Sequence, residues 1–546
     1  MIDLWYKDAI IYSLDVDAFQ DSNGDGIGDF RGLSERLDYL TSLGVTCLWL
    51  LPFYPSPNRD NGYDVMDYYG VDPRLGTLGD FVEFMRRARE RGIRVLIDLV
   101  VNHTSDQHPW FQSARKDPAS PYRDFYVWSE TLPKNWNQGM VFPGYQDSIW
   151  AWDEEAGAYY LHRFYAHQPD LNISNPLVRE EICRIMGFWL ELGVSGFRLD
   201  AAPFLIEMKG TDSAHPADNE DQYAYLREFR DFLSWRQGDA ILLAEANISR
   251  DKVNQYFGDD ARLHMLFAFL VNQQLFLSLA KQETEPLVRG LRMLPVPPLT
   301  GQWANFLRNH DELDLGRLSE AERQKVFQEF GPDPSMQLYH RGLRRRLPPM
   351  LGGDRHRVEL AYSLMFALPG TPVVRYGEEI GMGEDLSLAE RESVRTAMQW
   401  SDEEKGGFTS FTCPGRPVIS GGEYGYEKVN VAAQQRDPKS LLHWMVRLIS
   451  ARKQCPEVGW GSWEILEAGD PAVFALRYDW QDGTVITVHN LADREAAVRL
   501  HIDGGEPLFE LIGDRPYELI ASDEEIALRP YGYRWFRLGG TRHFLL

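Results

Sequence analysis

Short apolar runs alternate with longer amphipathic segments over most of the chain. Eight of the runs have the length and the Val, Ile, Leu and aromatic content of buried strands, at residues 9–16, 45–52, 94–101, 193–200, 240–245, 264–270, 303–310 and 371–377. The segments between them carry Leu, Phe, Ile and Trp at helical spacing, as in 31–43, 78–91, 177–192 and 221–236. Strands that alternate with helices predict a parallel sheet, and eight such units predict a closed (β/α)8 barrel of the α/β class, a TIM barrel.

Two connections are far longer than ordinary βα loops, which take about 2 to 6 residues. The first, 102–176, is rich in Trp, Tyr, Pro and Gly, and we expect a small inserted domain B over the barrel mouth. The second consists of the insertions 313–352 and 378–435, which flank a predicted helix at 355–368. We expect both connections to act as lids over a pocket.

After a predicted helix near 439–453, the chain changes to short alternating runs such as AVFALRYDW and GTVITVHNL. This alternation is typical of antiparallel strands and predicts a terminal β-sandwich. The expected organisation is therefore a catalytic barrel with lid insertions, an inserted domain after strand three and a C-terminal antiparallel β-sandwich, at residues 1–101 with 177–456, 102–176 and 457–546, respectively.

The charge balance narrows the classes of partner. With 57 basic and 81 acidic residues the net charge is −24, which repels nucleic acid and anionic membranes. No apolar run approaches a membrane span and the N-terminus lacks the pattern of a signal peptide, so we expect a soluble cytoplasmic protein. The four cysteines have no CxxC or metal-like spacing, which favours buried free thiols.

Polar residues gather where the predicted strands end. They are Asp98, Asn102 and His103 after the third strand, Arg198 and Asp200 after the fourth, Glu245 after the fifth, and His310 and Asp311 after the seventh. Any one acid could belong to a structural ion pair. Because the carboxyl ends of the strands form one rim of a barrel, the whole set predicts an active site there.

Several acids without a Ser or Cys nucleophile point to cleavage of a glycosidic bond. In a retaining enzyme one carboxylate attacks and a protonated one about 5–5.5 Å away donates to the leaving oxygen. In GFRLD, Arg198 lies two residues before Asp200 on the same side of the strand, where a cation keeps a carboxylate ionised. Glu245 follows the apolar ILLA, which would raise its pKa toward that of a general acid. Asp98 fits a supporting role beneath the rim.

The segments DLVVNHTSDQHPWF, GFRLDAAP, LLAEAN and FLRNHDEL resemble the ordered signatures of glycoside hydrolase family 13, the α-amylase superfamily, over essentially the whole chain. The resemblance implies a barrel with an inserted domain and a C-terminal sandwich. It implies Asp200 as nucleophile, Glu245 as acid/base and Asp311 as the acid that stabilises the transition state. It also implies substrate contacts from Tyr63, His103, Arg198 and His310.

QPDLN at 168–172 resembles the oligo-1,6-glucosidase group of that family. In that group an Asp in DNGYD and an Arg before the MQW segment close the pocket around the non-reducing glucose, and Asp60 and Arg395 match these positions. A closed end implies exo action on small α-glucosides. The alternative is that Asp60 and Arg395 form a surface salt bridge.

Within the group, LLPFYPSP, GAYYLHRF, GLRRRL and EEIGMGEDL resemble the trehalose synthases, which interconvert maltose and trehalose by α-glucosyl transfer. Such an isomerase must hold the released glucose and exclude water, a task suited to the long insertions. The chain departs from that pattern in RYGEE and RTAMQW, where Arg375 replaces a Tyr near the expected acceptor site. The divergent stretch NWNQGMVFPGYQDSIWAWDE is a further departure.

Two other functions remain open at this point. One is a hydrolytic exo-α-glucosidase that shares the first chemical step. The other is a catalytically silent interaction protein, like the heavy subunits of amino-acid transporters, which lack acids of the triad and carry a membrane span. We expect the partners to be small α-glucosides such as maltose or trehalose; an oligomer is compatible with the sequence.

DSNGDGIGD at 21–29 resembles part of a calcium loop but lacks the Glu at the twelfth place. A solvated turn is the alternative, whereas the family resemblance implies Ca²⁺, or Mg²⁺, held by Asp21, Asn23, Asp25, Asp29 and the Ile27 carbonyl. It implies a second metal at Asn102, Asp170, Glu207 and the carbonyls of Phe204 and Leu205. We expect both metals to be structural, because hard oxygen cages away from the scissile bond offer it no Lewis acid.

Overall fold

The computed structural model describes residues 3–207, 209, 222–500, 502, 507–517, 520–521 and 524–539. Eight parallel strands close into a barrel in the order β1-β14-β10-β9-β8-β7-β3-β2. Their bounds are β1 Ile11–Leu14, β2 Cys47–Leu50, β3 Arg94–Leu99, β7 Gly196–Leu199, β8 Ile241–Ala244, β9 Met265–Phe267, β10 Gln302–Phe306 and β14 Thr371–Arg375. Each strand lies inside one of the eight predicted runs or overlaps it, so the predicted barrel is confirmed.

Alternation along each strand separates the two sides of the barrel wall. Ile11, Trp49 and Leu96 face the interior, where they share a core with Phe267 and Phe306. Their sequence neighbours pack outward in the larger core beneath the helices. Because successive strand residues point to opposite sides, this register places the charged residues near the strand ends inside the barrel mouth.

Local sequence signals set the ends of the surrounding helices. Thr77 and Asp80 form a capping box at α4 (Leu78–Glu90), and Asn175 caps α6 (Pro176–Glu191), which begins with proline. The predicted helix at 31–43 is two helices, α2 (Phe30–Glu35) and α3 (Leu37–Leu43). The other predicted helices correspond to α8 (Ala224–Arg236), α14 (Arg355–Ala367) and α16 (Leu441–Lys453), although Asp221, the first residue predicted for α8, lies outside the described residues.

The long connection after β3 holds a small sheet of its own. It contains α5 (Pro109–Lys116) and three antiparallel strands, β4 (Trp128–Ser129), β5 (Trp150–Asp153) and β6 (Ala158–Leu161). The insertion after β10 holds α12 (Glu320–Phe330) and the short strands β11 (Leu313–Asp314), β12 (Gln337–Leu338) and β13 (Gly342–Leu343). Both insertions thus have internal structure rather than being open loops.

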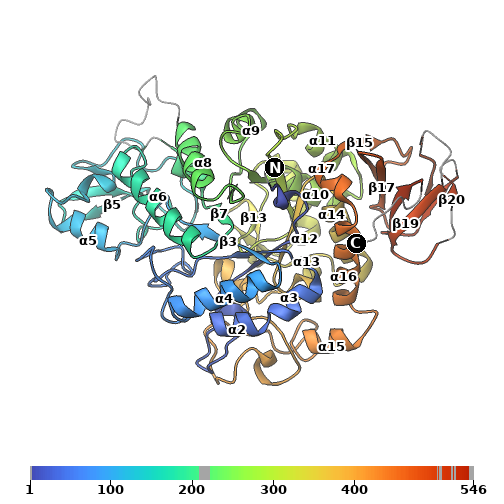
Figure 1. Ribbon diagram of the computed structural model, residues 1–546, viewed down its shortest axis with the longest axis horizontal. Helices are drawn as coiled ribbons and strands as arrows, with labels where there is room; N and C mark the ends of the chain where they lie inside the picture. The colour runs from blue at the N-terminus through green and yellow to red at the C-terminus, as the bar shows by residue number, and fades with distance from the viewer. Residues whose placement is uncertain are drawn as a thin grey trace.

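The C-terminal part forms two antiparallel sheets. One has the order β15-β16-β17-β22-β19-β20 and the other pairs β18 with β21. Their bounds are β15 Ser462–Leu466, β16 Val473–Trp480, β17 Gly483–Asn490, β18 Ala496–Val498, β19 Pro507–Gly513, β20 Ile520–Ala521, β21 Ile526–Leu528 and β22 Tyr533–Leu538. Residues of both sheets share one apolar core, as expected for a sandwich. In Figure 1 the sandwich lies at the opposite end of the molecule from α5 and β5. The exact domain limits stay predictions.

Hydrogen bonds attach the sandwich to the barrel through α14. The Ser363 hydroxyl lies 2.9 Å from both Trp535 Nε1 and His489 Nε2, and Tyr533 donates to Glu359 at 3.0 Å. In the part of the chain that the structure describes, no helix combines the length and apolar character needed to cross a membrane.

Candidate active site

The guanidinium of Arg198 is the centre of the first group of predicted residues. It contacts Asp98 Oδ1 at 2.7 Å, Glu245 Oε2 at 2.6 Å and the carboxylate of Asp200. Arg198 is 1% exposed and also lies over the ring of Trp49. Nη1 of Arg198 donates to Asp200 and Nη2 donates to Glu245, so the guanidinium holds the two acids side by side at the cavity.

The backbone after β7 supports this arrangement. Phe197 and Leu199 belong to the outer core, which leaves Arg198 inside. Ala201 adopts a left-handed φ of 48°, and its N–H lies 3.4 Å from Glu245 Oε2. The turn directly after Asp200 therefore ends the strand and adds a contact to the neighbouring acid.

Burial and charge separate the roles of these acids. Burial raises the pKa of Asp200 to about 6, although Arg198 opposes the shift. Burial raises the pKa of Glu245 to about 7, with Arg198 again opposing it and the carboxylate of Asp200 adding to it. Near neutral pH Asp200 is therefore mainly ionised while Glu245 retains a substantial protonated fraction, which suits a nucleophile and a general acid. Burial likewise raises the pKa of Asp98 to about 6.

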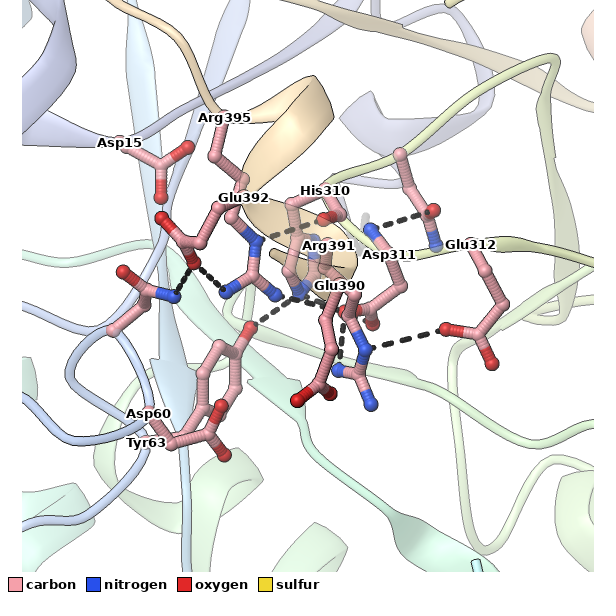
Figure 2. A network of polar contacts seen from close by, with 12 residues as sticks. Asp15, Asp60, Tyr63, His310, Asp311, Glu312, Glu390, Arg391, Glu392 and Arg395 are labelled. Atoms are coloured by element: carbon pink, nitrogen blue, oxygen red, sulfur yellow. Dashed lines mark hydrogen bonds and ion pairs between the residues drawn. The ribbon is translucent and has the colours of Figure 1, made fainter. Parts of the chain in front are cut away.

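Asp311 has the opposite environment. Its Oδ1 lies 2.5 Å from Arg391 Nη1 and 2.9 Å from Arg395 Nη2, and His310 Nε2 is 3.3 Å from its other oxygen. Figure 2 shows Arg391 between Asp311 and Glu312. Burial alone would raise the pKa of Asp311, but Arg391, His310 and Arg395 outweigh it and hold the pKa well below its ordinary value.

Aromatic and imidazole rings link the two groups of charges. Tyr63 stacks on His310 with centroids 5.5 Å apart, and its hydroxyl lies 2.7 Å from His310 Nε2 and 3.2 Å from Asp98 Oδ2 (Figure 2). His103 Nε2 lies 3.1 Å from the Tyr63 carbonyl oxygen. Tyr63 and His103 line the cavity, whereas Arg198, His310 and Arg395 are buried behind its surface.

The cavity has a volume of about 310 Å³ and contains all three predicted catalytic acids on its wall. Sequence reasoning named fewer than half of its lining residues. Among those that it missed are Met140, Val141, Phe142, Asn247, Glu312, Asp314, Arg341 and Arg391. Glu312 directly follows Asp311 in NHDEL, and Arg391 precedes Arg395 by four residues, so their proximity in the chain was the available signal.

Asp60 lines this cavity and accepts a hydrogen bond of 2.8 Å from Gln168, within the QPDLN segment. Burial raises the pKa of Asp60 to about 6, against the pull of Arg391 and Arg395. Among the described residues no ion pair joins Asp60 to Arg395, because Arg395 is engaged by Asp311 and Glu392. At 2% exposure, Arg395 is not part of a surface salt bridge.

Inserted residues from both long connections meet over the cavity. The Val141 carbonyl accepts a hydrogen bond of 2.8 Å from Arg341, and Phe142 contacts Tyr339 at a centroid distance of 4.9 Å. The guanidinium carbon of Arg391 lies over the ring of Phe142, 4.7 Å from its centroid. The divergent stretch of domain B therefore forms part of the cover, as expected of a lid.

Arg375 lies elsewhere than we expected. It is 2% exposed at the end of β14, 3.4 Å from Asp15 and over the ring of Tyr376, and it is absent from the cavity lining. It pairs in register with Ser13 of β1, and its charge acts on Asp15, His310 and Glu392, so it belongs to the buried charges behind the cavity wall. Arg375 is therefore not a lining residue, and its influence on the acceptor site stays a prediction; Arg341 and Arg391 are cations that do line the cavity.

Carboxylate oxygens of the N-terminal loop, residues 21–29, accept hydrogen bonds from backbone N–H groups of the same loop. Asp21 accepts from the N–H groups of Asn23, Gly24 and Gly26, and Asp25 accepts from that of Ile27. Asp29 accepts from Ser22 and Gly32. The carboxylate, amide and carbonyl oxygens of this loop are the hard ligands that Ca²⁺ prefers. No group of three or more His, Cys, Asp and Glu side chains within the described residues has the arrangement of a metal site.

The second predicted metal set is brought together only in part. Asn102 Nδ2 lies 3.4 Å from Asp170 Oδ1, and Phe204 and Leu205 belong to the short helix α7 (Ala202–Leu205). Glu207 forms an ion pair of 2.7 Å with Arg163. The ammonium of Lys209, which we did not predict, lies between Asn102 and Asp170.

Comparison with known proteins places these features in a family. The model of the α-amylase catalytic domain matches residues 12–326 and 344–461, and that of the sucrose hydrolase-like C-terminal domain matches 483–537. A trehalose synthase of Pimelobacter sp. (strain R48) is 42% identical, over 98% of this chain and 96% of that protein. An oligo-1,6-glucosidase of Parageobacillus thermoglucosidasius is 32% identical, over 98% and 99%. The crystal structure of a trehalulose synthase variant in complex with Tris superimposes on this chain with a TM-score of 0.78 at 28% identity. The superposition covers 98% of this chain and 100% of that one.

Proposed function

Because this chain belongs to the α-amylase family, we propose that it is a retaining α-glucosyl transferase that isomerises small α-glucosides, interconverting maltose and trehalose through a covalent glucosyl-enzyme. The proposal assigns Asp200 as nucleophile, Glu245 as acid/base and Asp311 as the acid that stabilises the transition state. Its partners are small sugars, and the acids act on them at the mouth of the barrel.

In the first step a carboxylate oxygen of Asp200 attacks C1 of the non-reducing glucosyl unit of maltose. The bond from C1 to the glycosidic oxygen breaks, and the protonated carboxyl of Glu245 gives its proton to that oxygen, which leaves as the 4-hydroxyl of glucose. Arg198 keeps Asp200 ionised before attack. The permanently ionised Asp311 stabilises the positive charge that develops on the sugar ring.

In the second step the released glucose stays in the cavity and turns. Its anomeric hydroxyl oxygen attacks C1, the bond from C1 to Asp200 breaks, and the carboxylate of Glu245 takes the hydroxyl proton. The product is trehalose, and both acids return to their starting protonation states. Attack by water instead of glucose would release a second glucose.

One observation favours transfer over hydrolysis: hydrogen bonds and ring contacts hold domain B against the insertions after β10 and β14 across the top of the cavity. Val141 binds Arg341, and the ring of Phe142 lies against Tyr339 and Arg391. Tyr165 and Tyr339 both donate to Glu390, at 2.9 Å and 2.6 Å. A cover held at several points slows the escape of glucose and the entry of water. The 42% identity to a trehalose synthase over nearly the whole chain supports the same conclusion.

The test is product analysis with maltose as the sole substrate. We expect trehalose to form in excess of free glucose, and trehalose as substrate to yield maltose. Release of glucose alone would contradict the transfer step and would favour the hydrolytic exo-α-glucosidase. A panel that adds sucrose and isomaltose would define the linkages accepted.

We also propose that the N-terminal loop binds a structural Ca²⁺ or Mg²⁺ through Asp21, Asn23, Asp25, Asp29 and the Ile27 carbonyl. The loop's ordering by carboxylate and amide oxygens supports this. Equilibrium dialysis of the wild-type protein against Ca²⁺, compared with Asp25→Ala, tests it. Equal binding by the two proteins would contradict it.

A further inference from the structure

The side chain of Lys209 occupies the centre of the second predicted metal set. It is fully buried, and its Nζ lies 2.7 Å from Asn102 Oδ1 and 2.9 Å from Asp170 Oδ2. The backbone carbonyls of Asn102 and Leu171 accept from it at 3.2 Å each. Four oxygens thus surround one ammonium.

These oxygens come from segments that are distant in the chain. Asn102 follows β3 at the start of domain B, and Asp170 and Leu171 lie near its end, before α6. Lys209 follows the segment that begins at the nucleophile strand β7. Backbone contacts already bring the two ends of domain B together, because the Leu171 N–H donates to the Asn102 carbonyl at 2.8 Å. The ammonium adds the third segment to this junction.

The remaining charges of the set are neutralised as well. Glu207 pairs with Arg163 at 2.7 Å, and the backbone N–H of Arg163 donates to Asp170 Oδ1 at 2.9 Å. A divalent ion among these oxygens would face the Lys209 ammonium at close range without added negative charge. Like charges at such a distance in a buried place are strongly unfavourable. The residues present therefore do not fit a second metal.

We infer that Lys209 is the built-in cation of this junction, tying the two ends of domain B to the segment after the nucleophile strand, and that Asn102, Asp170, Glu207, Phe204 and Leu205 are not a metal site in this protein. The junction adjoins the cavity, because Asn102 Nδ2 lies 3.2 Å from Nδ1 of His103 on the cavity wall. The inference rests on these contacts alone and holds whatever reaction the enzyme catalyses.

Calcium binding gives the first test. Calorimetric titration with Ca²⁺ alone is made on Asp25→Ala, which removes a ligand of the N-terminal loop, and on Asp25→Ala with Asp170→Asn. Both proteins are kept at a temperature where circular dichroism shows them folded. We expect the same number of bound Ca²⁺ ions for both. A Ca²⁺ ion bound by Asp25→Ala and lost on adding Asp170→Asn would overturn the inference.

Thermal unfolding gives the second test. Lys209→Met leaves Asp170 without its cation, so we expect the midpoint to fall by about 3 °C or more. The matched control is Lys252→Met on the exposed surface of α9 (Arg250–Phe257), which should leave the midpoint unchanged. Equal midpoints for the two variants would overturn the inference, since a buried cation that ties three segments together cannot be replaced without loss.

Discussion

The two sides of the cavity hold carboxylates in opposite electrostatic environments. On one side three acids, Asp98, Asp200 and Glu245, share the single guanidinium of Arg198. On the other side Asp311 is held by two guanidinium groups, those of Arg391 and Arg395, which also pair with Glu312 and Glu392, respectively. Three carboxylates around one cation raise the carboxyl pKa values and keep a proton available near neutral pH. Two cations beside one carboxylate lower its pKa and keep it ionised. One cavity thus supports both proton transfer and charge stabilisation.

The largest expected effect comes from the acid-rich side. Asp200→Asn removes the proposed nucleophile, and we expect turnover of maltose to fall by at least about 10⁴-fold. The measurement is the initial rate of trehalose plus glucose formation. Asp402→Asn, at an exposed position, is the matched control and should keep wild-type activity. Retained activity in Asp200→Asn would refute the assignment of the nucleophile.

Substitution of Asp311, on the side of the cavity that holds Arg391 and Arg395, should give the next largest effect. Asp311→Asn removes the negative charge that we propose stabilises the developing positive charge, and it removes one carboxylate partner of Arg391 and Arg395. We expect kcat to fall by about 10³-fold with a smaller change in KM, because the interaction belongs to the transition state. An effect confined to KM would mean that Asp311 only binds substrate.

The pH profile sharpens the comparison. Activity should fall below about pH 6 because Asp200 becomes protonated, and above about pH 7 because Glu245 loses its proton. We therefore expect a bell-shaped kcat/KM for maltose with tenfold losses per pH unit on each side. In Glu245→Gln with α-glucosyl fluoride, whose leaving group needs no proton, the alkaline limb should disappear. An unchanged alkaline limb would assign it to another group.

A smaller effect is expected at the cover. Arg341→Met removes the hydrogen bond to Val141, worth about 1 kcal/mol, and we expect the ratio of glucose to trehalose to rise about fivefold. Quantifying both products from maltose gives the ratio. Arg31→Met, on the exposed surface of α2, is the control and should not change it. An unchanged ratio in Arg341→Met would show that this contact does not limit the entry of water.

The smallest effect on chemistry is expected at Arg375, which lies outside the cavity. Arg375→Tyr should leave the product ratio unchanged, because its side chain faces Asp15 rather than the sugar. It should lower the midpoint of thermal unfolding by about 3 °C, since Asp15 stays buried without its cation. A changed product ratio at unchanged stability would restore Arg375 to the acceptor site.

The sequence predicted the barrel well, because buried strands with helical crossovers leave a strong repeating signal. It also predicted which strand ends carry acids, since Glu245 directly follows ILLA, Asp200 ends GFRLD and Asp311 lies four residues after Leu307 of WANFL. It missed most of the cover. Phe142, Tyr339 and Arg391 lie in irregular segments, where spacing in the chain does not indicate which residues meet. Lys209 was missed for the same reason.

By itself, then, the sequence determined the fold and predicted which acids lie at the barrel rim, because alternation of side chains along a strand is local and decides which residues enter the barrel. Tertiary structure decided the rest. Only packing gave Asp98, Asp200 and Glu245 one shared cation and Asp311 two, and only packing put Lys209 where a metal was expected and Arg375 beside Asp15. Charge pairing between distant segments depends on their positions in space, and these positions follow from the complete fold.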